Sequence, residues 1–191
     1  FDCLVGSEMC IRDREYPNFE KKSLDELELK LSEPIKKINI RGKKKEFFTK
    51  AGKILSIILP IEPNTGSSNQ QFNALWLSPD EWLVYFNEDN NNVYNDLYNE
   101  ISKLNFGSIV DVSNQWICIN IKGKKTFDLL SSGSPFNFNN FKNTKNSVTQ
   151  TLLNHTDVII HHTEINEINL FVRRSFSEDL WLWIKDSARF I

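Results

Sequence analysis

Four charged residues in this sequence are of the types that a ligand site or a partner surface requires. Asp111 follows an apolar segment, and Asp157 opens another. A carboxylate at either place binds a ligand or, more simply, accepts hydrogen bonds from neighbouring backbone amides. Arg173 and Arg174 are adjacent, so alternation along an extended chain points one of them toward a partner or an internal carboxylate. The sequence therefore offers groups for binding.

Metal ligands and nucleophiles are poorly placed along the chain. His161 and His162 are neighbours, and on a strand their side chains point to opposite faces, so they do not share one ion. Cys118 lies in an alternating apolar run and is expected to be a buried, unreactive thiol. The sequence has no G-x-S-x-G, P-loop or G-x-G-x-x-G motif. We therefore expect no catalytic residue and no metal site in this chain.

Tryptophans and arginines are the candidate partner contacts. Trp76 and Trp82 flank a turn at 78–81, and Trp183 projects from a helix whose other apolar residues face the core. Trp and Arg are favoured anchors of protein interfaces, although burial in the core is the simpler alternative for each tryptophan. The predicted interface candidates are Trp76, Trp82, Arg173, Arg174 and Trp183.

The elements that must position these residues follow one order twice: strand, helix, strand, strand, helix. In the first half they are predicted at 36–41, 43–55, 72–77, 82–86 and 91–104. In the second half they are predicted at 116–121, 126–130, 158–162, 168–173 and 175–185. The pattern predicts an α+β fold of two similar β-α-β-β-α halves packed together, because two such units bury faces that neither buries alone.

A short repeat supports this division into halves. The sequence INIRGKK at 38–44 reappears at 119–125 as INIKGKK. We predict one domain over 35–188, with halves at about 35–107 and 108–188. Residues 1–14 resemble the translation of a sequencing-adapter remnant and are excluded from the fold. Residues 15–34 form a lead-in, in which the charged part at 20–30 has a weak helical pattern.

Composition limits the classes of function. The chain has 191 residues, 40% of them hydrophobic, and no apolar run long enough to span a membrane. Its 23 Lys and Arg against 25 Asp and Glu give a net charge of −2, so no overall positive field attracts nucleic acid or an anionic membrane. The three cysteines form no even disulfide set and no secretory signal is evident, so the expected location is the cytoplasm.

Four segments, in their order and spacing, carry a family resemblance. They are ALWLSPDEWL at 74–83, VDVS at 110–113, QTLL at 150–153 and RRSF at 173–176. With them the chain resembles the gamma subunit of the heterotetrameric sarcosine oxidases over most of 31–188. The DVS segment is shared with the wider family of glycine-cleavage T-protein-like folate-binding domains. Ser134 is a departure, because gamma subunits usually carry Cys there.

The resemblance implies a T-protein (aminomethyltransferase) folate-binding-domain-like fold and a non-catalytic, structural subunit. The family's complex oxidatively demethylates sarcosine to glycine and passes the one-carbon unit to tetrahydrofolate. Its larger subunits hold FAD, FMN, NAD and tetrahydrofolate, so this chain is expected to bind no cofactor and to dock against them in a hetero-oligomer. In T-protein-like domains a carboxylate at the start of a hairpin strand engages folate, and Asp157 is the matching position here.

Two alternatives stay open. A free-standing folate-binding or aminomethyl-transfer protein would need a central cavity, open to solvent and lined by Asp111, Asp157 or Arg173. An RNA-associated protein would need the lysines at 43–44 and 124–125 to merge into one basic face. A subunit would instead expose an apolar patch beyond the few hundred Å² usual for monomers.

Overall fold

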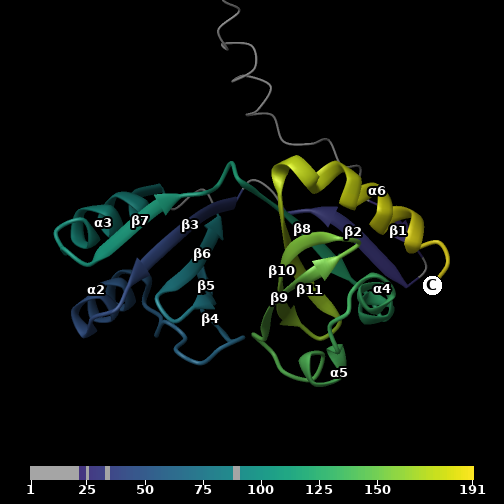
Figure 1. Ribbon diagram of the computed structural model, residues 1–191, viewed down its shortest axis with the longest axis horizontal. Coiled ribbons are helices and arrows are strands. Elements are labelled where there is room, and N and C mark those ends of the chain that lie inside the picture. The colour runs from purple at the N-terminus through teal and green to yellow at the C-terminus, as the bar shows by residue number, and fades with distance from the viewer. Residues whose placement is uncertain (1–21, 25, 33–34, 88–90) are drawn as a thin grey trace, which may run out of the picture.

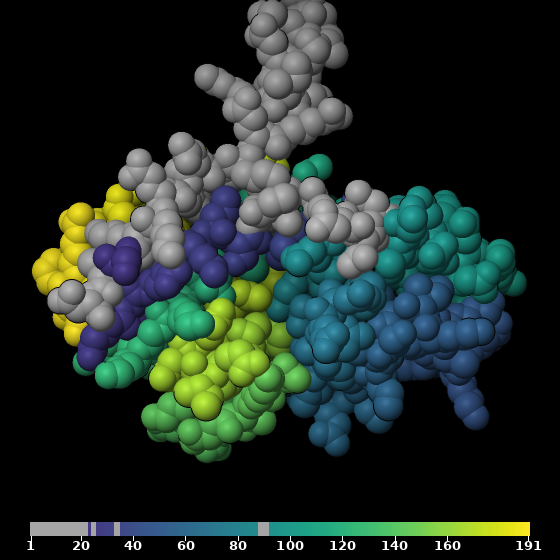
Figure 2. All heavy atoms as spheres, turned by 180° about the vertical axis from the view of Figure 1, so that it is seen from behind, coloured from purple at the N-terminus to yellow at the C-terminus, as the bar shows by residue number. Residues whose placement is uncertain are grey.

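Two antiparallel sheets stacked face to face, with helices outside them, form the protein (Figure 1). The structure is a computed structural model that describes residues 22–24, 26–32, 35–87 and 91–191. The predicted adapter-derived segment, 1–14, lies outside the described residues. Seen from behind in Figure 2, the two halves of the chain form adjoining lobes, one blue to teal and one green to yellow. None of the helices in the described ranges is long and apolar enough to cross a membrane.

The first lobe is a five-stranded sheet in the spatial order β4-β5-β6-β3-β7. Helices α2 and α3 cover its outer face, as Figure 1 shows. The strand, helix, strand, strand, helix order predicted for this half is confirmed. The elements are β3 (Ile35–Gly42), α2 (Lys45–Leu55), β4 (Gly66–Ser68), β5 (Phe72–Ser78), β6 (Glu81–Asn87), α3 (Asn91–Ile101) and β7 (Gly107–Asp111).

The second lobe is a six-stranded sheet in the spatial order β1-β2-β8-β11-β10-β9. Its outer face packs against helices from the second half of the chain. The strands are β1 (Lys22–Leu24), β2 (Leu27–Leu31), β8 (Trp116–Lys122), β9 (Val148–Leu153), β10 (Thr156–Glu164) and β11 (Glu167–Arg173). The helices are α4 (Thr126–Gly133), α5 (Phe138–Phe141), η2 (Arg174–Phe176) and α6 (Ser177–Ser187).

The two sheets share one topology, which confirms the predicted similarity of the halves. The order β4-β5-β6-β3-β7 corresponds to β9-β10-β11-β8-β2. The repeated INIRGKK and INIKGKK segments start on the equivalent strands β3 and β8. Their asparagines make equivalent hydrogen bonds: Asn39 Nδ2 donates to Glu81 Oε1 at 2.6 Å, and Asn120 Nδ2 donates to Glu167 Oε1 at 3.0 Å. Each glutamate is the first residue of the next central strand.

Within the N-terminal lead-in, residues 22–24 and 27–31 are strands, so the weak helical pattern expected at 20–30 is wrong for these residues. β2 pairs with β8, with Leu29 opposite Ile121. Leu27 and Leu29 are buried whereas the residues between and after them are partly exposed, which is the period-two alternation of a strand. Position by position, β2 occupies in the second sheet the place that β7 occupies in the first. The first sheet includes β7 and so extends to Asp111, past the boundary predicted at 107.

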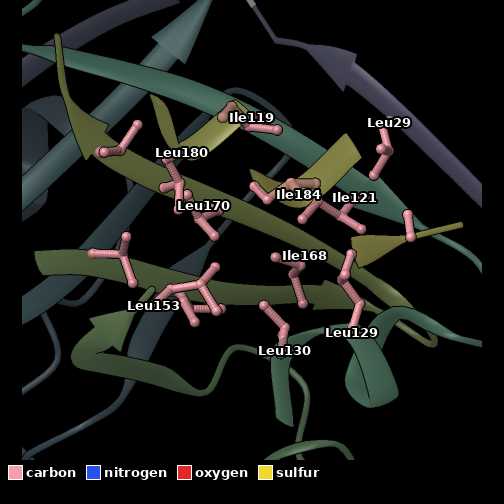
Figure 3. Close-up of a cluster of buried hydrophobic side chains, with 14 of the residues drawn as sticks. Leu29, Ile119, Ile121, Leu129, Leu130, Leu153, Ile168, Leu170, Leu180 and Ile184 are labelled. Atoms are coloured by element: carbon pink, nitrogen blue, oxygen red, sulfur yellow. The ribbon is translucent and has the colours of Figure 1, made fainter. Parts of the chain in front are cut away.

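Alternation along the strands creates three hydrophobic layers. The outer face of the first sheet packs on α2 and α3, and that of the second sheet packs on α4, α5 and α6. Figure 3 shows the second of these clusters, in which Leu29, Ile121, Leu170 and Leu180 come from four different elements. The third layer lies between the sheets, so the faces that remain on each lobe cover one another.

The inter-sheet layer contains buried polar groups as well as apolar ones. Tyr85 of the first sheet contacts Phe171 of the second, with ring centroids 5.0 Å apart. The Tyr85 hydroxyl accepts from Asn169 Nδ2 at 3.0 Å and lies 2.7 Å from His161 Nδ1. The Tyr85 hydroxyl thus connects Asn169 and His161, two residues of neighbouring strands in the second sheet. Lys37 is also fully buried, with Nζ 3.3 Å from the carbonyl oxygen of Ser113.

Burial controls the protonation of the imidazole in this layer. His161 is 0% exposed, and this burial, together with the nearby His162, lowers the pKa of His161 from 6.5 to about 3. Within the described residues Nε2 of His161 has no hydrogen-bond partner. The contact between the sheets therefore holds His161 in its neutral form.

Replacing Leu29 by Ala tests whether β2 is a core strand. The side chain is fully buried, so its truncation is expected to lower the free energy of unfolding by about 2–5 kcal/mol, measured by urea denaturation. Lys30→Ala, on the opposite face of the same strand and partly exposed, should change it by less than about 0.5 kcal/mol. An equally small effect of Leu29→Ala would contradict the pairing of β2 with the second sheet.

Acid should destabilise the protein through His161. Its pKa is lower in the folded chain, so the stability it contributes is complete above pH 6.5 and decreases as the pH falls from 6.5 toward about 3. Between pH 7 and pH 5 the free energy of unfolding of the wild-type protein should fall by about 2 kcal/mol more than that of His161→Gln. Gln cannot titrate, and its amide group can still form a hydrogen bond with the Tyr85 hydroxyl as donor or acceptor. Parallel pH profiles for the two proteins would refute this assignment.

Candidate functional site: an inter-sheet pocket and an apolar groove

A pocket of about 610 Å³ opens between the two sheets. Both Asp157 and Arg173 line it, although the sequence separates them and gives no sign that they meet. The first sheet contributes Leu77 and Glu81, from the hairpin between β5 and β6. Such a volume lies within the range of small-molecule sites. The pocket brings together Asp157 and Arg173, two predicted site residues from different strands.

The strand register explains why these residues share one wall. Trp116 of β8 pairs with Arg173 of β11, and Asp157 of β10 pairs with Leu152 of β9. The β10–β11 ladder begins at Val158, and one residue further it brings Asp157 opposite Arg173. Side chains at such positions point to the same face of a sheet. Four adjacent strands thus present a row of side chains to the pocket: Trp116, Arg173, Asp157 and Leu152.

The guanidinium of Arg173 is held away from Asp157. Its Cζ atom lies 4.2 Å from the centre of the Trp116 ring, and Nη1 donates to Gln115 Oε1 at 3.0 Å. No ion pair joins Arg173 to any carboxylate of the described residues. The carboxylate of Asp157 makes neither a hydrogen bond nor an ion pair within that part of the chain. Two opposite charges therefore line one pocket without pairing.

The polar side chains Glu81 and Gln150 on the facing wall of the pocket already bond to other groups of the protein. Glu81 accepts from Asn39 at 2.6 Å, and its second oxygen lies 3.8 Å from Nε of Arg41. Gln150 Nε2 donates to the Leu77 carbonyl oxygen at 2.8 Å, which connects β9 to the first sheet. Asp157 and Arg173 are therefore the groups of this pocket that are available to a ligand.

Asp111 lies outside the pocket and has the backbone-bonding role. Oδ1 accepts from the Ser113 amide at 2.9 Å, and Oδ2 pairs with Lys36 Nζ at 2.5 Å. Partial burial acts to raise the pKa of Asp111, but hydrogen bonds from Lys36 and Ser113 outweigh it and hold that pKa below its usual value. The cavity required by the folate-binding alternative thus includes Asp157 and Arg173 but not Asp111.

The predicted interface role of Trp82 is wrong. Trp82 is fully buried, because its position on β6 faces α2, and its ring lies 5.8 Å from that of Phe47. Its Nε1 donates to the Pro60 carbonyl oxygen at 2.7 Å. A side chain in this position packs the core and cannot anchor a partner.

The other predicted interface residues remain at least partly exposed to solvent. Trp76 is half-buried beside Trp82, and Trp183 is half-buried against Gly133, where an added Cβ would lie 2.3 Å from the Trp183 ring. Arg174 is half-buried and Arg173 is exposed in the pocket. Their roles at an interface stay predictions.

Two strongly exposed isoleucines lie where the sequence analysis proposed no interface. Ile58 is 88% exposed and Ile61 is 75% exposed. Ile58 lines a groove of about 400 Å³ beside α2, together with Phe48 and Leu59, and Ile61 follows shortly after Leu59 in the chain. The apolar run ILSIILPI at 54–61 continues past the end of α2 at Leu55, and this is the signal that could have indicated it.

The backbone after α2 shapes this groove. Ser56 has φ 53°, a left-handed conformation that ends the helix and reverses the chain. Gly52 allows the close return, since a Cβ at that position would lie 3.0 Å from the Ile57 carbonyl oxygen. Lys45 lines the groove and has no carboxylate partner within the described residues.

Metal chemistry has no support in the described part of the chain, where no three His, Cys, Asp or Glu side chains gather as a metal site requires. His161 and His162 are both buried, and the two rings make separate contacts: His161 with Tyr85, and His162 Nδ1 with the Thr144 carbonyl oxygen at 2.8 Å. Cys118 is buried and free of disulfides.

Two solved structures share this arrangement of elements. One is the heterotetrameric sarcosine oxidase from Corynebacterium sp. U-96 in complex with pyrrole 2-carboxylate. Over 84% of this chain and 83% of that chain the TM-score is 0.79, with 19% identity. The other is the glycine cleavage system aminomethyltransferase T from Bartonella henselae, with a TM-score of 0.61 and 9% identity over 83% of this chain and 45% of that one. These likenesses establish a T-protein-like fold.

Sequence comparison adds the family. No curated protein matches the sequence. The sarcosine oxidase, gamma subunit family matches it over residues 44–189, which covers most of both lobes. The chain therefore belongs to the sarcosine oxidase, gamma subunit family.

Proposed function

We propose that this chain is a non-catalytic, structural subunit of a sarcosine oxidase-like complex. The observation that carries the proposal is its membership of the gamma subunit family over residues 44–189. The fold it shares with a chain of a heterotetrameric sarcosine oxidase supports the same role. In this role the chain binds larger subunits and stabilises their arrangement.

The chemistry in this proposal belongs to the larger subunits. They oxidatively demethylate sarcosine to glycine, pass the one-carbon unit to tetrahydrofolate, and hold FAD, FMN, NAD and tetrahydrofolate. The gamma-type chain itself holds no cofactor and works in the cytoplasm. Its buried histidines and cysteine support a structural role, since each is enclosed in the core and inaccessible to a substrate.

The groove beside α2 is the docking face that the surface favours. Exposed Ile58 in its lining, with exposed Ile61 three residues further along the chain, offers apolar area that water contacts in the isolated chain. Lys45 in its lining gives it a positive charge that no described carboxylate neutralises. The complementary partner is a segment of a larger subunit with an apolar side chain for the groove and acidic residues on either side.

The alternative of a free-standing folate-binding or aminomethyl-transfer protein rests on the inter-sheet pocket. Asp157 and Arg173 line it, as that alternative requires. Tetrahydrofolate binding by the isolated chain, with no association with the larger subunits, would favour this function over that of a subunit.

Co-expression with sarcosine oxidase-type larger subunits tests the docking face. Ile58→Asp and Ile61→Asp each place a charge in the apolar contact, so each is expected to weaken association by about 2 kcal/mol, roughly thirtyfold in Kd. Association is measured by size-exclusion chromatography with detection of flavin absorbance. Ile165→Asp is the matched control, because Ile165 is 85% exposed in the β10–β11 turn of the other lobe.

Two results would contradict these proposals in different ways. If Ile165→Asp weakens association and the two groove variants do not, the docking face is wrong while the subunit role stands. If the wild-type chain does not associate with the larger subunits at all, the subunit role itself is wrong.

A further inference from the structure

Asp157 and Arg173 make the inter-sheet pocket a receptor for two charges at once. Each is an exposed charged group without an ion-pair partner in the described residues, and both line the same cavity of about 610 Å³. Opposite charges at directly opposed strand positions stabilise a sheet when they pair with each other. Here Arg173 is occupied on its far side by Trp116 and Gln115, so it leaves Asp157 unpaired.

The held position of Arg173 suits it to bind an anion. Stacking on Trp116 at 4.2 Å and one hydrogen bond from Nη1 to Gln115 fix the plane of the guanidinium. The backbone supports this arrangement, because the Arg174 amide donates to the Gln115 carbonyl oxygen at 2.9 Å. A guanidinium has five N–H donors, and a carboxylate accepts two of them side by side. Arg173 is therefore a preorganised carboxylate receptor.

The spacing of the two charges defines the ligand. Neighbouring strands lie about 4.8 Å apart, so the side chains of Asp157 and Arg173 start one strand spacing from each other. An α-amino acid carries its ammonium and its carboxylate on the same carbon atom. One such molecule can donate from its ammonium to Asp157 while its carboxylate accepts from Arg173.

The rest of the pocket indicates the ligand's side chain. Ile159 and Val112 contribute apolar wall, and exposed Leu152 and Phe176 stand at its edge. The volume is much larger than the charged part of an amino acid requires. A large apolar or aromatic side chain would cover this surface and exclude water from the two charge contacts.

We propose that the inter-sheet pocket binds a free α-amino acid with a large apolar side chain, its carboxylate on Arg173 and its ammonium on Asp157. This site is independent of the docking groove, which lies on the outer side of the other lobe beside α2. It gives the chain a small-molecule ligand in addition to the partner subunits of the proposed function.

Isothermal titration of the full chain with three related compounds tests this. Phenylalanine has both charges, N-acetylphenylalanine lacks the ammonium, and phenethylamine lacks the carboxylate. Each charge-assisted contact contributes about tenfold in affinity, so phenylalanine should bind about tenfold tighter than either partial ligand. Equal affinities for all three, or no saturable binding of phenylalanine, would overturn the proposal.

Variants assign each charge and control for folding. Asp157→Asn should weaken phenylalanine about tenfold and leave N-acetylphenylalanine unchanged, while Arg173→Gln should weaken phenylalanine and leave phenethylamine unchanged. The unchanged compound reports that the pocket is intact. Asp186→Asn and Arg189→Gln make matched charge changes in an exposed pair near the C-terminus and should alter none of the three affinities.

Competition separates this ligand from a folate. Tetrahydrofolate that binds the pocket tightly while phenylalanine does not would overturn the proposal and favour the folate-binding alternative. Repeating the phenylalanine titration with the assembled complex tests amino-acid binding independently of the proposed subunit role. Loss of association with larger subunits in the groove variants, with phenylalanine affinity retained, is the expected combination.

Discussion

The contact between the inner faces of the two sheets is the constraint on which this structure depends. Each lobe buries its outer face under its own helices, but its inner face carries Lys37, Tyr85 or His161 together with apolar side chains. Such a face is too polar to form a core alone and too apolar to remain in water. Stacking of the sheets removes the apolar side chains from water. It also brings polar atoms of the two sheets into contact, as with Tyr85 and His161. The pocket is the part of this contact that the side chains leave unfilled.

Sequence patterns predicted the elements whose signal is local. Period-two and helical spacing identified most central strands and helices, and the INIRGKK repeat indicated the duplicated topology. β2 was missed because a five-residue strand with charged neighbours resembles a weak helix until its pairing with β8 is known. The burial of Lys37 was missed for the same reason. On one lobe alone its face of β3 would be solvent-exposed, and only the second lobe covers it.

The candidate site shows the same limit at the level of single residues. Asp157 and Arg173 could be selected from residue type and strand position, but their convergence depends on the register of β10 and β11 and on the stacking of the sheets. Trp82 was misassigned because a tryptophan next to a turn suits a surface and a core equally well. The groove beside α2 depends on the left-handed Ser56, which composition and periodicity do not reveal.

The position of β2 makes the second lobe depend on a strand that precedes the first lobe in the chain. Leu31 lies opposite Ile119, so β2 leaves the ribosome long before the strand that it pairs with. The first lobe is closed by β7, which is translated directly after the elements it completes. The second lobe instead has to recruit a strand from the opposite side of the first lobe in the chain, a non-local pairing that delays its folding. A strand translated before the first lobe is thus needed to complete the second lobe, so a change that damages β2 destabilises a lobe whose other strands lie far along the chain.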